Sequence, residues 1–410
     1  MPPSGLRVGV AFGGRSVEHD VSIITGLQAL AVLQERHSPI PIYISRSGRW
    51  FTGNVLRDLA TYQSEAVGRD GGRGPVVGNG GDPDADEIHF DLHNGRLLRA
   101  GGGGGSLLRR RSSPEPIELD VVVLATHGTQ GEDGCLAGAL ELARLPYVGP
   151  SVGAAAAAMD KVTTKAILAQ AGLPALEHLA FRREQWEHEG ASIAARARKR
   201  LSLPLYVKPA SLGSSVGVTR CESEEQVAQA LELVFELDRV CLIEPAVEDG
   251  IEVNCAVIGR PGSEPRASVC EQPIAAEGFL SFEDKYMRDG SSKGMKGAQR
   301  LIPAPIDAEL TERVQRLAAQ AFTAFGCAGV TRVDFLIDAF GNPYVNELNT
   351  IPGSFSFYLW EPSGLPFVDL MDELLDLSLA EQLQTQRTTT VFDTSLLALR
   401  ASGAKAGEKG

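Results

Sequence analysis

The sequence predicts a protein of the mixed α/β (α+β) class with more than one domain. Its 410 residues suffice for two or three domains of roughly 100–200 residues each. Hydrophobic residues make up 43% of the chain and charged residues 22%, so there is enough apolar material for several cores. Short apolar segments alternate with helical patterns over the first third, which is typical of a parallel sheet covered by helices.

The first third contains two strand-and-helix units. Residues 7–12 form an apolar run that predicts a buried strand, and Gly13-Gly14 then turn the chain into a helix. A second apolar run at 119–126 predicts another strand, and a helix follows it near 134–145. We expect the two strands to lie in one parallel sheet.

A glycine-rich segment, 64–115, separates these two units. It includes five consecutive glycines at 101–105, so we expect an insertion without a regular core. Within it, residues 89–98 can form a hairpin, because Asn94-Gly95 favours the tight turn that joins two antiparallel strands.

The remaining elements follow from periodicity, capping residues and breakers. A helix is expected from Ser151 to residue 171, where Gly172 and Pro174 stop it. Another helix begins at Ser223 in a capping-box pattern. The other expected elements are strands at 203–208, 240–244, 252–258, 330–338 and 343–349 and a helix at 307–325. The tail, 386–410, is expected to be flexible.

Charge and composition exclude several classes of protein. The formal net charge is −13, which is opposite to what a nucleic-acid partner requires. The six cysteines lack CxxC spacing, which favours a reducing compartment over a disulfide framework or a zinc site. Since no apolar run reaches the ~18 residues that span a bilayer, we expect no membrane segment and a cytoplasmic protein.

Two neighbouring strands near the C-terminus carry an unusual set of polar residues. If Ile337 pairs with Tyr344 across the turn, Asp334 lies opposite Glu347 and Arg332 lies opposite Asn349, all on one face. Opposed carboxylates repel each other unless a cation lies between them, and oxygen ligands of this kind suit Mg²⁺. From these residues alone, a Mg²⁺ site and an exposed ion-pair network are equally good interpretations.

A lysine followed by a loop of small residues indicates a second candidate site. Lys208 ends an apolar strand, and residues 209–217 then supply glycines, serines and backbone N–H groups that can approach an anion. The spacing is not that of a Walker A motif, because the lysine precedes the loop. Lys161 and Lys285 are further candidates, although single lysines are usually solvated.

Six motifs occur along the chain in one order. They are FGGRSVEHDVS (12–22), HGTQGEDG (127–134), MDK (159–161), VKPASLGSSVGV (207–218), DKY (284–286) and TRVDF with VNELNTIPG (331–353). With these motifs the chain resembles the D-alanine–D-alanine ligases of the ATP-grasp superfamily. The resemblance covers residues 6–380 apart from 64–115.

The resemblance implies three domains, with ATP held between two antiparallel sheets. A Rossmann-like N-terminal domain would span 1–149, a central ATP-grasp domain 150–243 and a C-terminal ATP-grasp domain 244–385. The implied reaction forms D-alanyl-D-alanine for peptidoglycan through an acyl phosphate. A homodimer is also implied.

The resemblance also assigns roles to individual residues. ATP would be bound by Lys161, Lys208, Ser215 and Lys285 at its phosphates, by Glu244 at the adenine and by Glu252 at the ribose. Asp334, Glu347 and Asn349 would hold two Mg²⁺ ions, with Mn²⁺ as a substitute. Glu18 and His127 would bind the first amino acid, and Ser214 and Tyr286 would join Glu18 in a closing network. Arg332 and the Gly353 amide would stabilise the oxyanion.

The second amino acid is the open part of this assignment. Tyr358 and Leu359 stand where the family has a serine-leucine pair, and a phenol is larger than a serine hydroxyl. D-serine or another second substrate is therefore an alternative to D-alanine, and Tyr358 also has a purely packing interpretation beside Phe355 and Phe357. A regulatory nucleotide-binding protein that has lost its chemistry is the alternative from a different class.

Overall fold

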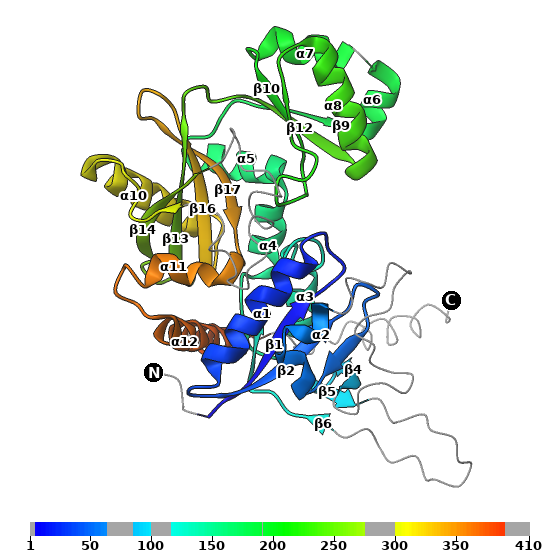
Figure 1. Ribbon diagram of the computed structural model, residues 1–410, viewed down its shortest axis with the longest axis vertical. Helices are drawn as coiled ribbons and strands as arrows, with labels where there is room; N and C mark the ends of the chain where they lie inside the picture. The colour runs from blue at the N-terminus through cyan, green and yellow to red at the C-terminus, as the bar shows by residue number, and fades with distance from the viewer. Residues whose placement is uncertain (1–4, 64–84, 100–115, 191, 275–299, 390–410) are drawn as a thin grey trace, which may run out of the picture.

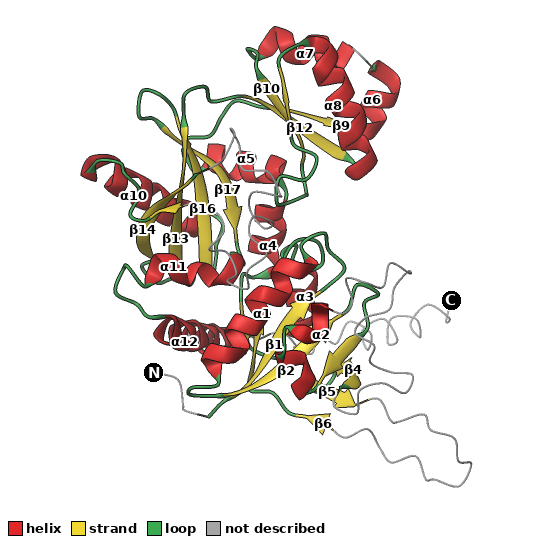
Figure 2. Ribbon diagram, viewed as in Figure 1, coloured by secondary structure: helices red, strands yellow, loops and turns green. Residues whose placement is uncertain are grey.

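The computed structural model confirms a mixed α/β fold built on three sheets (Figure 1). It describes residues 5–63, 85–99, 116–190, 192–274 and 300–389. Figure 2 shows one sheet with its helices at the top of the molecule, a second sheet beside α10, and a third sheet beneath α1.

The N-terminal sheet has eight strands in the order β6-β5-β4-β3-β2-β1-β7-β8. The strands β1 and β2, β1 and β7, and β7 and β8 pair in parallel, as expected for two strand-and-helix units, and β3 to β6 extend the sheet with antiparallel pairs. The strands are β1 Arg7–Gly13, β2 Ser38–Ile44, β3 Trp50–Thr52, β4 Asp86–Asp91, β5 Arg96–Arg99, β6 Pro116–Ile117, β7 Val121–Leu124 and β8 Tyr147–Val148. The helical segments are α1 His19–Leu33, η1 Asn54–Arg57, α2 Ala60–Gln63 and α3 Cys135–Leu142.

The expected hairpin within the glycine-rich segment is confirmed. β4 and β5 pair antiparallel, with Asp91 opposite Arg96 at the closing end. Gly95 adopts the left-handed backbone conformation that the turn requires. The flanking stretches 64–84 and 100–115 lie outside the described residues.

The helix expected from Ser151 to residue 171 is in fact two helices. α4 Val152–Met159 ends at Asp160, whose extended backbone breaks the helix, and α5 Lys161–Gln170 then begins. The Asp160 carboxylate accepts a hydrogen bond from the Thr163 amide and caps α5. Both helices pack on the C-terminal sheet, although the predicted boundaries assign them to the central domain.

The central sheet has four antiparallel strands in the order β11-β10-β12-β9, with helices on one face (Figure 1). The strands are β9 Leu179–Arg182, β10 Leu205–Pro209, β11 Thr219–Cys221 and β12 Val240–Pro245. The helices are α6 Arg183–Glu189, α7 Ser192–Arg200 and α8 Glu224–Leu237. Ser223 caps α8 as its sequence predicts.

The C-terminal sheet has five antiparallel strands in the order β15-β14-β13-β16-β17. The strands are β13 Ile251–Gly259, β14 Arg266–Pro273, β15 Arg300–Leu301, β16 Gly329–Ile337 and β17 Pro343–Asn349. The helices are α10 Ala308–Ala324, η3 Gly353–Ser356, α11 Phe357–Trp360 and α12 Phe367–Gln386. The helix α12 was not among the elements expected from the sequence.

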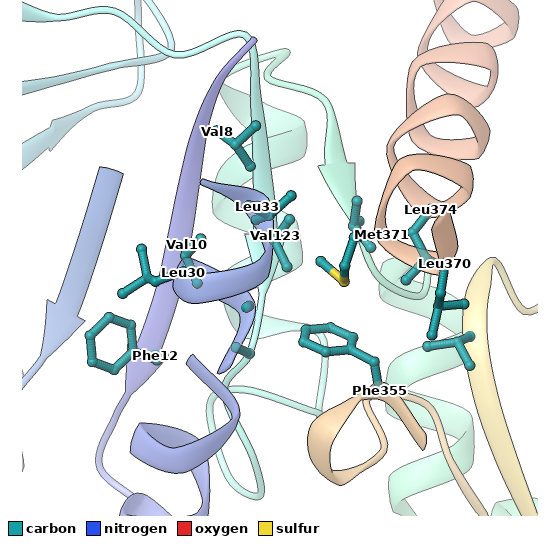
Figure 3. Packing of buried hydrophobic residues seen from close by; sticks show 14 of the residues in the cluster. Val8, Val10, Phe12, Leu30, Leu33, Val123, Phe355, Leu370, Met371 and Leu374 are labelled. Atoms are coloured by element: carbon teal, nitrogen blue, oxygen red, sulfur yellow. The ribbon is translucent and has the colours of Figure 1, made fainter. Parts of the chain in front are cut away.

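One hydrophobic cluster joins the two ends of the chain (Figure 3). Phe12 and Leu30 come from β1 and α1, whereas Phe355 and Met371 come from the segment after β17 and from α12, and all four are almost completely buried. Burying apolar surface is the main favourable contribution to folding, so this cluster fixes the segment after β17 against the N-terminal sheet.

The described part of the chain contains no helix that is both long and apolar enough to cross a membrane. All six cysteines are free thiols, and five of them are buried.

Candidate active site

The opposed acidic residues on β16 and β17 are confirmed, but the predicted pairing at the turn is wrong. Asp334 lies opposite Glu347 and Arg332 opposite Asn349, whereas Ile337 pairs with Pro343 and not with Tyr344. The ladder is irregular after Asp334, because Asn346 is an extra residue on β17. This bulge shifts the register by one residue, so the acidic pair still forms.

Arg332 already interacts with one of the opposed carboxylates. Its Nε and Nη2 donate to the two Asp334 oxygens at 2.6 and 2.7 Å. The Asn349 amide donates to Asp334 at 2.9 Å. Asp334 is 2% exposed, whereas Glu347 and Asn349 are partly exposed. One face of the hairpin therefore carries a buried ion pair and three residues with oxygen ligands.

These residues fit a magnesium ion that is also held by a phosphate group. Mg²⁺ usually takes one or two carboxylates from the protein and completes its octahedron with water and phosphate oxygens. Asp334 and Glu347 supply two carboxylates, and the Asn349 side-chain oxygen is a third oxygen ligand on the same strand pair. Among the described residues no group of three His, Cys, Asp or Glu forms a protein-only metal site.

Lys208 and Glu244 form a buried ion pair on the facing sheet. Lys208 Nζ contacts a Glu244 oxygen, and Lys165 on α5 binds the other oxygen at 3.1 Å. Burial alone would raise the pKa of Glu244, but the two lysines overcome that effect and lower it to about 2. Lys165 was not among the predicted residues, and only its position one helical turn after Lys161 pointed to it.

A contact between the two sheets also involves Lys208. Its Nζ lies 3.5 Å from the Asn346 side-chain oxygen, so the bulged residue on β17 reaches the end of β10. The predicted ATP and metal residues therefore face one another across the space between the central and C-terminal sheets. No motif or spacing in the sequence singled out Asn346.

The loop after Lys208 is held by two hydrogen bonds from Lys161. Lys161 donates from Nζ to the Leu212 carbonyl at 2.7 Å, and its backbone N–H donates to the Ala210 carbonyl at 2.9 Å. Ser214 and Ser215 both have left-handed backbone conformations, with φ of 49° and 59°. Such strain in non-glycine residues persists where surrounding contacts enforce it, often at ligand sites.

The tip of this loop contacts Glu18. The Ser214 hydroxyl donates to Glu18 Oε1, as the expected closing network requires. A Cβ on Gly213 would lie 3.0 Å from Glu18 Oε2, and a Cβ on Gly128 would lie 2.6 Å from the same oxygen. Two glycines from different loops therefore make room for this carboxylate, which is 7% exposed with the rest of its residue.

Two further titratable groups, His127 and Glu132, lie in the loop whose Gly128 closely approaches Glu18. Burial lowers the pKa of His127 to about 4, so the ring is neutral, and its Nε2 lies 2.9 Å from the Thr25 hydroxyl. Burial and the Glu18 charge together raise the pKa of Glu132 to about 8. Glu132 accepts a hydrogen bond from the Gly128 amide. The HGTQGEDG motif contained Glu132, but no role was predicted for it.

The segment after Gly353 is held in an unusual conformation. Ser354, Phe355 and Ser356 all have positive φ, between 52° and 54°. The Ser354 amide donates to the Thr25 hydroxyl at 3.1 Å, which ties this turn to the pocket around Glu18. The turn thus lies beside both α1 and β16, and it begins at Gly353, whose amide is the predicted oxyanion donor.

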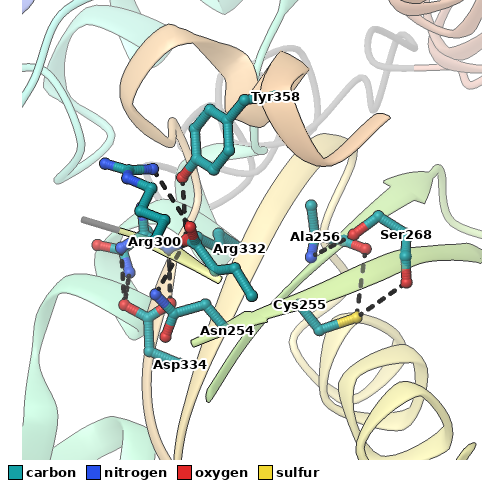
Figure 4. A network of polar contacts seen from close by, with 10 residues as sticks. Asn254, Cys255, Ala256, Ser268, Arg300, Arg332, Asp334 and Tyr358 are labelled. Carbon is teal, nitrogen blue, oxygen red and sulfur yellow. Dashed lines mark hydrogen bonds and ion pairs between the residues drawn. The ribbon is translucent and has the colours of Figure 1, made fainter. Parts of the chain in front are cut away.

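The two residues predicted to hold the second amino acid have different surroundings. Leu359 is completely buried in the hydrophobic cluster that joins the two ends of the chain, so any contact with a substrate would come from its backbone. Tyr358 donates from its hydroxyl to Glu271 Oε1 at 3.1 Å (Figure 4). The predicted packing of Tyr358 against Phe357 also occurs, with the rings at 77°.

Glu271 belongs to a polar network that the sequence analysis missed. The Asn254 amide donates to Glu271 at 3.2 Å, and Arg300 donates to it at 3.3 Å (Figure 4). These residues come from three strands and lie far apart in the sequence, so no spacing revealed them. Glu252 lies two residues before Asn254 on β13, and therefore on the same face of the sheet.

The predicted Lys285 and Tyr286 lie outside the described residues. Of the other predicted residues, Glu347, Lys208, Glu244 and Glu18 all lie near enough to Lys161 to act on its pKa, so groups from the three predicted domains meet in one region. That region contains a carboxylate, lysines, side-chain oxygens and an arginine, groups that can bind an ammonium ion, phosphates, a cation and an oxyanion respectively. These groups suit the transfer of a phosphoryl group to a carboxylate, followed by attack of an amine.

Comparisons with known proteins agree with this chemistry. The family model for the D-ala D-ala ligase N-terminus matches residues 7–150, and the model for the D-ala D-ala ligase C-terminus matches residues 167–376. The D-alanine–D-alanine ligase of Thermosipho melanesiensis is 34% identical over 404 residues, which cover 96% of this chain and 99% of the relative.

Two solved structures are similar over nearly their whole length. The D-alanine–D-alanine ligase from Coxiella burnetii has a TM-score of 0.74 and 27% identity, with 98% of this chain and 99% of that one covered. The VanG D-Ala:D-Ser ligase from Enterococcus faecalis has a TM-score of 0.72 and 27% identity, with 91% and 99% covered.

Proposed function

This chain belongs to the D-alanine–D-alanine ligase family of ATP-dependent ligases, and we propose that it joins two D-alanine molecules into D-alanyl-D-alanine. The observation that carries the proposal is the meeting of Glu18 with Ser214. A carboxylate from the N-terminal domain and a loop from the central domain enclose the place where the first amino acid's ammonium group would bind. We further propose that the protein works in the cytoplasm as a homodimer and supplies peptidoglycan synthesis.

ATP would lie between the central and C-terminal sheets. Lys161, Lys208 and Ser215 would bind its phosphates, together with Lys285, while Glu244 and Glu252 would bind the adenine and the ribose. Lys208 contacts Glu244 in the structure, so we propose that ATP draws this lysine toward its phosphates. The charge of Glu244 remains balanced, because Lys165 stays bound to its other oxygen.

Two Mg²⁺ ions would be held by Asp334, Glu347 and Asn349. Bound there with ATP, they would neutralise charge on the phosphates during transfer. The carboxylate of the first D-alanine attacks the γ-phosphorus, which yields an acyl phosphate and ADP. The acyl carbon then has a good leaving group, so one difficult step is divided into two easier ones.

The second step forms the peptide bond. The amine of the second D-alanine attacks the acyl carbon, a tetrahedral oxyanion forms, and phosphate leaves. The Arg332 guanidinium and the Gly353 amide would stabilise that oxyanion, since both lie at the junction of β16 with the turn after β17. Ser214, with Tyr286 in the family's closing network, would keep water from the acyl phosphate.

A ligase for D-serine as second substrate is the other candidate. Tyr358 favours it, because a phenol stands where the family has serine and changes the shape of the second subsite. The similarity to the VanG D-Ala:D-Ser ligase structure is compatible with this candidate.

One assay separates these candidates. The purified protein is supplied with Mg-ATP and a panel of D- and L-amino acids, singly and in pairs, and phosphate release and product masses are measured. D-alanyl-D-alanine from D-alanine alone is the expected result. A product that forms only when D-serine is added would favour the second candidate, and nucleotide binding without turnover on any pair would overturn both.

A further inference from the structure

Five polar residues form a row across the C-terminal sheet beside the reaction centre. Register places Glu347 opposite Asp334, Asp334 opposite Asn254, and Asn254 opposite Glu271, and Arg300 extends the row from the edge strand. Glu271 lies two strands from Asp334, which is roughly 10 Å at the usual strand spacing of about 4.8 Å. The row thus runs from the metal residues to Tyr358.

The Glu271 carboxylate is already fully engaged. Its Oε1 accepts hydrogen bonds from the Tyr358 hydroxyl at 3.1 Å and from the Asn254 amide at 3.2 Å. Its Oε2 accepts one from Arg300 Nη1 at 3.3 Å. Since Glu271 is 1% exposed, its charge needs these partners, and it is not available to bind a ligand.

Arg300 has unused hydrogen-bonding capacity. A guanidinium has five N–H donors, and its Nε is buried without a hydrogen-bond partner among the described residues. Its guanidinium carbon lies 4.3 Å above the Tyr358 ring, so the cation is held between a carboxylate and an aromatic face. An oriented, partly buried arginine with spare donors suits a carboxylate.

Asn254 supplies a hydrogen-bond acceptor, whereas Arg300 supplies donors. Its side chain is 4% exposed, and its Oδ1 is buried without a partner in the described part of the chain. In the row, this acceptor lies between Asp334 and Glu271. Its strand, β13, pairs directly with the strand that carries Arg332, whereas Arg300 is on the edge strand. A free amino acid has an amine that donates hydrogen bonds and a carboxylate that accepts them, and the row offers a partner for each.

We propose that Arg300, oriented by Glu271 and Tyr358, binds the carboxylate of the second amino acid, and that Asn254 accepts a hydrogen bond from its amine. This inference rests on the proposed ligase function and deepens it. The Tyr358 phenol binds Glu271 instead of the substrate, and Arg300 takes over the role that a serine hydroxyl would have. The subsite therefore selects a nucleophile that carries an α-carboxylate.

The test compares two nucleophiles that compete for one acyl phosphate. D-alanine has a carboxylate, whereas hydroxylamine does not; hydroxylamine attacks the same carbon, releases phosphate and gives D-alanyl hydroxamate. Both products are measured by mass at fixed D-alanine and increasing hydroxylamine. The ratio of dipeptide to hydroxamate then reports only on the second nucleophile, because the first step is common to both products.

In the Arg300→Gln variant the dipeptide-to-hydroxamate ratio should fall by roughly 10–100-fold, the usual effect of losing a charge-assisted hydrogen bond. Hydroxamate formation should stay close to the wild-type rate, and Arg300→Lys should recover part of the ratio. Arg266→Gln is the matched control, since Arg266 is an exposed arginine on β14 that pairs with Glu373. This control should leave the ratio unchanged.

Two results would overturn the inference while leaving the ligase function intact. In the first, Arg300→Gln lowers dipeptide and hydroxamate equally, which is the signature of a purely structural role. In the second, the variant leaves the ratio unchanged. Failure of the wild-type protein to form either D-alanyl-D-alanine or D-alanyl hydroxamate would instead overturn the proposed function.

Discussion

Ser214 donates a hydrogen bond to Glu18 across 196 positions of sequence, and this contact joins the central domain to the N-terminal domain. The serine has a left-handed backbone, and the glycine before it approaches the same carboxylate closely. The loop is therefore shaped to reach Glu18. Because this hydroxyl directly connects the loop to Glu18, its removal is a direct test of closure.

Ser214→Ala should lower kcat/KM for the first D-alanine by roughly 10–100-fold, because a hydrogen bond to a charged group is lost. ATP binding, measured by calorimetry without D-alanine, should change little. Ser263→Ala is the control, since the Ser263 hydroxyl bonds to Arg260 in an exposed turn. Wild-type kcat/KM in the Ser214 variant would show that the contact has no part in closure.

Arg332→Ala should separate ATP binding from peptide formation. We expect the rate of dipeptide formation to fall by about 10²–10³, the usual effect of removing one oxyanion donor. Nucleotide affinity should stay within a few-fold, because the lysines that would bind phosphate are on other elements. Steady-state turnover and nucleotide titration are the measurements, and unchanged turnover would exclude this role for Arg332.

Glu132 should produce a pH-dependent step in activity. Its pKa is raised to about 8 by burial and by the Glu18 charge, so Glu132 is protonated near neutral pH. Losing that proton makes the pocket more negative and favours an ammonium ion, so kcat/KM for the first D-alanine should rise through about pH 8. In Glu132→Gln this rise should be absent, while activity near pH 7 stays similar.

The measurement is kcat/KM from about pH 6 to about pH 9.5, with wild type and variant in the same buffers. Stability should change with pH in the opposite direction to activity, because the folded protein holds the Glu132 proton more tightly than the unfolded chain. The stabilising contribution is present below the ordinary value of 4.5 and is lost as pH rises through about 8. If Glu132→Gln keeps the rise in kcat/KM near pH 8, another group is responsible for it.

The acidic pair shows what the sequence alone can predict. Alternation along β16 and β17 correctly put Asp334 and Glu347 on one face, since strand side chains repeat every two residues. The predicted turn pairing, Ile337 with Tyr344, was off by one residue, and the bulge at Asn346 compensates for that shift. Nothing in a strand pattern marks an inserted residue, so the bulge was not predictable.

Other features were hidden because they depend on tertiary contacts. The alanine-rich segment after Ser151 favours one continuous helix, yet the Lys161 amide bonds to Ala210 instead of continuing α4. Glu271 and Arg300 meet only because β14 and β15 pair. By contrast, α12 was detectable, since Leu370, Leu374 and Leu375 recur at helical spacing.

The buried triad of Lys165, Glu244 and Lys208 gives a prediction on stability. In Lys165→Met, Glu244 keeps Lys208 but loses its second cation, and we expect the free energy of unfolding to fall by about 2–3 kcal/mol. The lowered pKa of Glu244, about 2 against an ordinary 4.5, stabilises the fold above pH 4.5. That contribution is lost as pH falls from 4.5 toward 2. In Lys165→Met this loss of stability with falling pH should be smaller.

Urea unfolding near pH 7 and near pH 4 measures both effects, since urea does not screen charges as guanidinium does. The matched control is Lys165→Met in a Glu244→Gln background. If Lys165 acts by balancing the Glu244 charge, the cost of the lysine substitution should largely disappear there. An equal cost in both backgrounds would mean that Lys165 stabilises α5 by packing alone, and the ion pair would then have no role in holding Glu244 beside the proposed ATP site.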